Sequence, residues 1–172
     1  MRTMGDWRDV LNADPTGWLL EEENPSVRYF TMLDILEKPE NAPDADTVRS
    51  AIMETGVVPR ILARQEKAGH WERAEDFYIR SKYRGTVWTL MTLAELGADG
   101  NDERIRKACE FILNNSQDPA SGGFSHLTAA TGGGDPEKLL PCLTGNMVWS
   151  LIRFGYLEDP RVQLGIQWIT RY

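Results

Sequence analysis

Apolar residues recur along this chain with the period of amphipathic helices. Between residues 103 and 114 they fall at i, i+3, i+4 and i+7, a single stripe on one helical face. That stripe consists of Ile105, Ala108, Cys109 and Ile112. The preceding stretch, residues 85–96, is apolar on more than one face, which indicates a helix buried on two sides. The same pair of patterns returns at 144–154 and 160–169, so the sequence predicts repeated pairs of an inner and an outer helix.

The first quarter of the chain has weaker signals. Asn24-Pro25 suits the start of a helix that runs to about Leu36, and Asp46 suits the cap of the next one. Residues 1–23 carry Trp7 and Trp18 among acidic and turn residues. We therefore expect an N-terminal arm over residues 1–23 and one helical-repeat domain over residues 24–172.

A turn motif accompanies the helices and occurs twice. The first copy is made of Gln65, Gly69 and Trp71, and the second follows 52 residues later with Gln117, Gly123 and Phe124. A glycine can end a helix in the left-handed conformation, and a glutamine amide can pair with backbone groups at helix ends. We expect both glutamines to bond backbone groups and both aromatic rings to pack over their turns. A motif repeated at a near-fixed interval is typical of a repeat architecture.

Composition and charge exclude several classes of partner. The formal net charge is −7, which argues against binding to nucleic acid or anionic membrane surfaces, since both require clustered positive charge. No apolar run reaches the ~20 residues of a membrane span, and the first residues lack the apolar segment of a secretion signal. Two cysteines, Cys109 and Cys142, provide no disulfide framework. These features favour a cytoplasmic location.

The repeated turn resembles that of a known superfamily. Gln65-x3-Gly69-x-Trp71 is similar to the glutamine-tryptophan repeat of squalene and hopene cyclases, and the stretch from Ala108 to Phe124 resembles the repeat of protein prenyltransferase β subunits. This resemblance implies an all-α fold, an α/α toroid in which inner helices surround a cavity. The chain supplies about three helical hairpins, about half of such a ring. We therefore expect a half-barrel that is either a truncated toroid or one completed by a partner.

The resemblance also directs attention to acidic and metal-binding residues. The acid cluster of the cyclases has a near match only in Asp44-Ala-Asp-Thr47, which a helix cap explains as well. In prenyltransferases Asp, Cys and His hold zinc, and Cys142 lies where that cysteine would fall, although Leu140 replaces the aspartate. His70, His126 and Asp135 could complete a zinc site with Cys142. The alternative is a half-buried thiol and two surface imidazoles.

A second candidate site precedes the first inner helix. Lys82, Tyr83 and Arg84 lie before it, and together with its first amides they would suit a diphosphate, as the resemblance to prenyltransferases implies. Trp88 and Trp149, on the two inner helices, would line a hydrophobic cavity. The alternatives are a solvated basic loop and ordinary core packing.

Two functions follow as hypotheses. The first is a prenyltransferase- or squalene-cyclase-like protein that binds a hydrophobic ligand, an isoprenoid if the resemblance extends to ligands, with catalysis left open. The second is a non-catalytic helical-repeat module that closes its apolar edge against another chain. An incomplete ring leaves apolar flanks without partners, and a homodimer would cover them.

Overall fold

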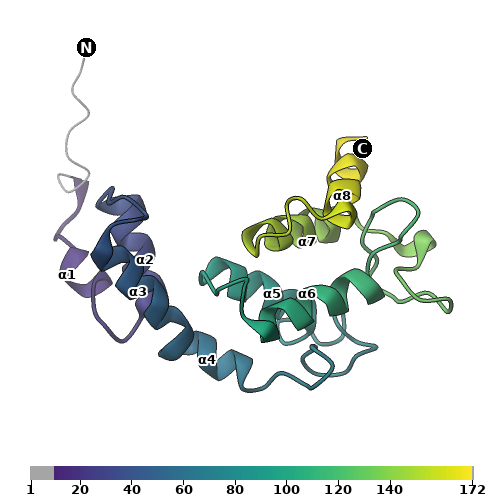
Figure 1. The fold of residues 1–172 in the computed structure, drawn as a ribbon, viewed down its shortest axis with the longest axis horizontal. Helices are drawn as coiled ribbons and strands as arrows, with labels where there is room; N and C mark the ends of the chain where they lie inside the picture. Colours follow the sequence, from purple (N-terminus) through teal and green to yellow (C-terminus); the bar gives the residue numbers. More distant parts are fainter. Residues whose placement is uncertain (1–9, 172) are drawn as a thin grey trace, which may run out of the picture. The chain divides into compact units, whose positions relative to one another are not determined.

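The described residues of the computed structural model are 10–171, and within them the secondary structure is helical, with isolated β-bridges and no strand (Figure 1). The all-α prediction is confirmed. Backbone contacts divide the chain into two compact units, Met1–Val57 and Val58–Tyr172. The predicted boundary after residue 23 falls inside the first of these units, and Trp7 lies outside the described residues.

The first unit is built around two helices. It contains the short α1 (Thr16–Leu19), α2 (Pro25–Phe30) with a π-helical turn at Thr31–Ile35, and α3 (Pro43–Glu54). α2 begins at Pro25 as expected, because proline suits the first helical position. The expected start of α3 at Asp46 is wrong, since Pro43 already begins the helix. α2 packs against α3, and the core residues are Tyr29, Met32, Ala45, Val48 and Ile52.

The second unit consists mainly of two helical hairpins. After α4 (Val57–Leu62) come α5 (Thr86–Glu95), α6 (Glu103–Asn115), a 3-10 turn (Pro136–Lys138), α7 (Pro141–Arg153) and α8 (Pro160–Thr170). α5 packs against both α6 and α7, and α7 packs against α8. The helix with apolar residues on several faces is therefore the one with two helical neighbours, as its pattern predicts. α7 begins three residues before its predicted start at Thr144, again at a proline.

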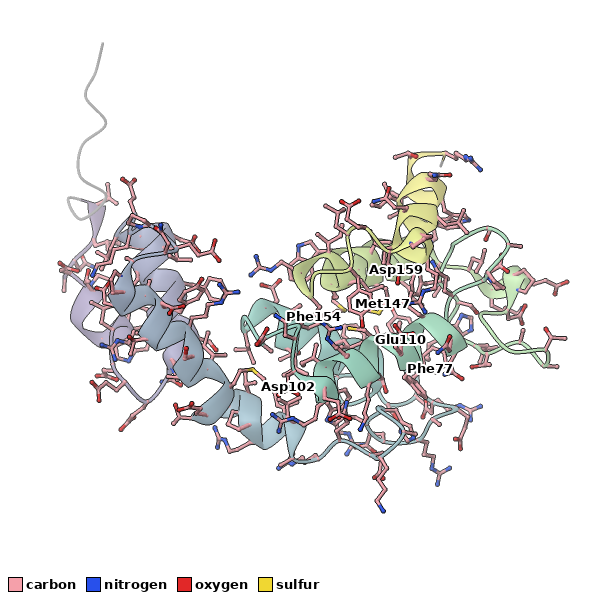
Figure 2. The ribbon with its side chains drawn as sticks, viewed as in Figure 1. Phe77, Asp102, Glu110, Met147, Phe154 and Asp159 are labelled. Atoms are coloured by element: carbon pink, nitrogen blue, oxygen red, sulfur yellow. The ribbon has the colours of Figure 1, made fainter. Side chains whose placement is uncertain are left out.

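Both outer helices of this unit begin in the same way. Asp102 accepts a hydrogen bond from the Arg104 amide at 2.8 Å, and Asp159 accepts one from the Arg161 amide at 2.8 Å. Arg161 also makes a bidentate ion pair with Glu110 of α6, at 2.8 and 2.9 Å, which connects the two outer helices. Glu110 and Asp159, which both bind Arg161, are labelled in Figure 2. The hydrogen bond from Arg161 lowers the pKa of Asp159 below its usual value.

The glutamine of each repeated turn makes the same pair of hydrogen bonds. Gln65 Nε2 donates to Gly69 O within its own turn at 3.2 Å and to Arg104 O of α6 at 2.8 Å. Gln117 Nε2 donates to Gly122 O at 3.1 Å and to Arg161 O of α8 at 2.7 Å. The expected contacts to backbone groups are confirmed. Each amide connects its turn to the first turn of the next outer helix.

A glycine allows each turn to lie directly on that helix. Gly69 has φ +92°, and a Cβ there would lie 2.5 Å from Lys107 O of α6. In the second turn the equivalent residue is Gly122, with φ +88° and a Cβ position 2.6 Å from Leu164 O of α8. The neighbouring Gly123 makes room for Trp168. No larger residue fits at Gly69 or Gly122 without moving backbone.

The aromatic residue of each turn is buried, as expected, and its amide is bonded to the next inner helix. The Trp71 amide donates to Thr86 Oγ1 at 3.1 Å, and the Phe124 amide donates to Thr144 Oγ1 at 2.8 Å. Both threonines lie in the first turn of an inner helix, α5 or α7. Each turn is therefore fixed to an outer helix by its glutamine and to an inner helix by its aromatic residue.

We predict that Gln117→Ala will lower the free energy of unfolding by about 2–3 kcal/mol, because it removes both hydrogen bonds of a buried amide, to Gly122 O and Arg161 O. Gln117 is only 3% exposed, whereas Gln65 is half-buried and water can replace part of its amide, so Gln65→Ala should cost less. Urea denaturation measures both. Gln167→Ala, on the exposed face of α8, is the matched control. Equal stability of Gln117→Ala and the control would contradict the role of the amide.

Candidate functional site

A pocket of about 210 Å³ lies within the second unit, beside the first repeated turn. Its walls come from the end of α4, the turn at Trp71, the loop before α5, and α5 itself. Ile61 and Trp71 form the apolar side. The Trp71 indole N–H donates to Ile61 O at 3.0 Å, which fixes the ring against α4. The pocket is thus built on the element that the sequence repeats.

The pocket also has cationic lining residues. Arg64 and Arg84 both line it, and Arg84 Nε lies 3.8 Å from the Glu72 carboxylate, a long contact for an ion pair. Within residues 10–171 no carboxylate forms an ion pair with Arg64. Two guanidinium groups beside an apolar wall can bind an anion that carries a hydrocarbon tail.

Tyr83 lines the same pocket in an unusual backbone conformation. Its φ is +67°, in the left-handed region that costs a residue with a side chain about 1–2 kcal/mol. The Ser81 carbonyl accepts from both the Arg84 and the Gly85 amide, at 2.9 and 2.7 Å, and so holds the turn in this shape. The phenol ring is 71% exposed, which leaves it accessible to a ligand. Strained residues of this kind are often found at functional sites.

The start of α5 does not present its first amides to the pocket. The Val87 amide donates to Phe77 O at 3.1 Å, and Gly85, Thr86 and Val87 are buried. The expectation that exposed helix amides would help to hold an anion is therefore wrong at Val87, because the loop before α5 covers the helix end. Thr92, which also lines the pocket, donates its hydroxyl proton to Trp88 O at 2.9 Å. Anion binding here would depend on Arg64, Arg84 and the Tyr83 hydroxyl.

The remaining residues of the predicted ligand site have other positions. Trp88 stacks on Tyr78, with ring centroids 5.4 Å apart, and meets Tyr83 at 5.2 Å. Lys82 Nζ lies 5.0 Å above the Tyr83 ring. Lys82 and Trp88 are thus adjacent to the pocket through Tyr83, whereas Trp149 of α7 is half-exposed and does not line it. Arg64 was missed in the sequence, although it directly precedes the repeated glutamine.

The predicted zinc ligands do not lie close together in the structure. In the described part of the chain no three or more His, Cys, Asp or Glu side chains form a group that could hold a metal ion. The His70 ring packs on Phe111 at 5.1 Å, and Asp135 caps the 3-10 turn by accepting from the Glu137 amide at 3.0 Å. His126 Nδ1 is buried without a hydrogen-bond partner, and Cys142 is exposed at the start of α7. Each residue has a separate environment.

The candidate acid residues are also poorly suited to protonating a hydrocarbon. Asp44 lies in the first turn of α3 and makes an ion pair with Lys38. The hydrogen bond from Lys38 lowers the pKa of Asp44, so the carboxyl is ionised at neutral pH. A general acid requires the opposite shift. Asp44 therefore behaves as a helix-terminus carboxylate.

Comparison with protein-family models, with curated proteins and with solved structures gave no match. Among the described residues, no helix has the length and apolar character needed to cross a membrane. The site therefore has to be interpreted from its own geometry.

The two cysteines should differ sharply in reactivity. Burial raises the pKa of Cys109 to about 12, so its thiol is protonated and inaccessible, whereas Cys142 is exposed. We predict that a thiol reagent such as DTNB labels one cysteine per folded chain and two in denaturant. Cys142→Ser should remove the fast reaction, and Cys109→Ser should leave it unchanged. Fast labelling of Cys109 in the folded protein would contradict the burial of α6.

Proposed function

We propose that this chain is a helical-repeat protein of the cyclase and prenyltransferase type that binds an amphipathic anion, an isoprenoid diphosphate or a ligand of that chemistry. The observation that carries the proposal is the pocket beside the first repeated turn. There Arg64 and Arg84 face a shared space with the exposed phenol of Tyr83, next to the apolar surface of Ile61 and Trp71. A diphosphate would lie between the guanidinium groups, and the hydrocarbon would follow the apolar wall.

The Glu72 carboxylate offsets the charge of one of the two arginines when no ligand is bound. It lies 3.8 Å from Arg84 Nε and is itself half-exposed, so its contact with the arginine is weak and easily exchanged. A bidentate diphosphate contact is shorter and stronger than this pair. The ligand would therefore displace Glu72 from Arg84. The proposed role is the binding of this ligand.

The test compares three compounds, so that the contribution of the charged group can be measured separately from that of the hydrocarbon. Farnesyl diphosphate should raise the melting temperature by several degrees at saturating concentration, and pyrophosphate or farnesol alone should raise it less, because each satisfies only one wall of the pocket. The shift by farnesyl diphosphate should disappear in the double variant Arg64→Gln/Arg84→Gln. Thermal unfolding monitored by circular dichroism measures the shift in melting temperature with each of the three compounds.

The control variant is Arg73→Gln, which removes an exposed arginine of the same unit that does not line the pocket. It should retain the full shift, and Lys82→Gln should retain most of it. Three results would refute the proposal: no shift with farnesyl diphosphate, an equal shift with pyrophosphate alone, or a shift that survives loss of both arginines.

A second function, that of an interaction module, is favoured by the apolar surface of the last hairpin. Ile169 of α8 is 38% exposed, whereas Ile112, at the same repeat position in α6, is fully buried. Ile152 of α7 is 36% exposed, and its counterpart in α5, Ala94, is 1% exposed. Trp149 lies on the same helix as Ile152 and is also half-exposed. A surface that is buried in one repeat but exposed in the next is a typical contact site for a partner chain.

We predict that the protein forms a homodimer through this surface. Sedimentation equilibrium should give about twice the monomer mass of 19.5 kDa, and Ile152→Lys/Ile169→Lys should reduce it to the monomer, because each lysine places a charge in the contact. Val27→Lys/Val57→Lys, which alters exposed apolar residues of other helices, is the control. A monomer mass for the unmodified chain at all concentrations would exclude this dimer.

A further inference from the structure

The first unit contains a second concavity, of about 610 Å³, that the proposed ligand site does not use. One wall is a stripe along α3, with lining residues at i, i+3, i+4, i+7 and i+11: Asp44, Thr47, Val48, Ala51 and Thr55. The four helical positions from Asp44 to Ala51 share one face of α3 and span about 10 Å at 1.5 Å per residue, and Thr55 follows as the C-cap of the helix. The concavity is therefore a groove that follows the whole length of α3, which we call the α3 groove.

The floor of the α3 groove is apolar. Val48 and Ala51 of α3 face Pro25, the first residue of α2. Gly56 lies beneath the same proline, since a Cβ at Gly56 would be 3.1 Å from Pro25 Cδ. The groove thus runs between two helices whose packing is fixed by a proline and a glycine. An apolar floor between two helices is the usual setting for an amphipathic third helix.

The rim of the α3 groove is acidic. Glu22, Glu23 and Asp44 border it together with Arg28, and Asp44 is paired with Lys38. Arg28 lies 3.6 Å from Glu22, whose side chain is 89% exposed. A pair this long and this exposed contributes little, so the Glu22 carboxylate can exchange Arg28 for another cation.

This rim belongs to a wider division of charge along the chain. Residues 10–57 contain ten Asp and Glu against three Lys and Arg, a net charge of −7, whereas residues 58–172 contain fourteen of each and are neutral. The whole excess of negative charge in the described chain therefore lies in the unit that carries the groove. Such a field attracts a cationic partner over about a Debye length and repels an anionic one.

We propose that the α3 groove is a docking site for a basic amphipathic helix of another protein. The apolar face of that helix would cover Pro25, Val48 and Ala51, and its lysine or arginine side chains would reach Glu22, Glu23 and Asp44. A helix is favoured over an extended segment because the apolar floor lies between two helices, which is the usual setting for an amphipathic helix. A second copy of this chain does not fit, because its own first unit is equally acidic.

The experiment uses the full chain and a fluorescein-labelled synthetic peptide of about 18 residues, long enough to be helical, with leucines at helical spacing and lysines elsewhere. Fluorescence anisotropy should show saturable binding that weakens as the salt concentration rises. A peptide with the same leucines and with glutamate in place of lysine should not bind. Spermine, a cation without an apolar face, should compete only weakly.

Two kinds of variant separate the groove from general charge. Glu22→Lys/Glu23→Lys should weaken binding at least about tenfold, equivalent to 1.4 kcal/mol, whereas Glu137→Lys/Glu158→Lys makes the same charge change on exposed residues of the second unit and should have a much smaller effect. Ala51→Gln and Thr47→Gln fill the groove without changing charge and should also weaken binding. Far-UV circular dichroism and melting temperature verify that the variants are folded.

The proposal is overturned by any of four outcomes: no saturable binding, equal binding of the lysine and glutamate peptides, equal effects of the two charge-reversal variants, or binding unchanged by filling the groove. Because the groove lies within residues 1–57 and the diphosphate pocket within residues 58–172, these results are independent of the proposed function.

Discussion

The second unit depends on one interaction that is made twice, the bond from a glutamine amide to a carbonyl at the start of the next outer helix. Gln65 and Gln117 each use both amide hydrogens, one within the turn and one on the following helix. Buried carbonyls without donors are costly, so each turn has a single favourable position. The close approach requires glycine at the left-handed position, because Gly69 and Gly122 touch the helix backbone. These contacts therefore fix the distance between successive helical hairpins.

The arginine-lined pocket is a consequence of this arrangement. Trp71 is held between Thr86 of α5 and Ile61 of α4, and this places its indole as one wall. The same turn positions Arg64 and Glu72 at the rim, and the strained loop at Tyr83 closes the other side. The second turn buries Phe124 under equivalent bonds but is followed by a long loop over residues 125–140, so the surroundings of the two turns differ.

The two units differ in their charge and in the sites that they carry. The first carries the negative charge and the α3 groove, and the second is neutral and contains the repeats and the arginine-lined pocket. The net charge of −7 of the whole chain is therefore the charge of the first unit, and the second unit contributes none of it. The net charge of the whole chain does not disfavour a small anion at the second unit, because that unit is neutral and Arg64 and Arg84 share a pocket there.

Much of the fold was predictable because it depends on local rules. Helical periodicity identified the inner and outer helices, and the spacing of Gln65, Gly69 and Trp71 identified the turn, since helix endings and side-chain caps act over a few residues. The site was predictable only in part. Tyr83 and Arg84 share a pocket as their proximity suggested, but Arg64 joins them only through the fold of the Trp71 turn. Contacts between distant segments determine whether a helix start is exposed or covered, as it is at Val87, and whether Cys142 and His126 come together. Only the tertiary structure decides those contacts.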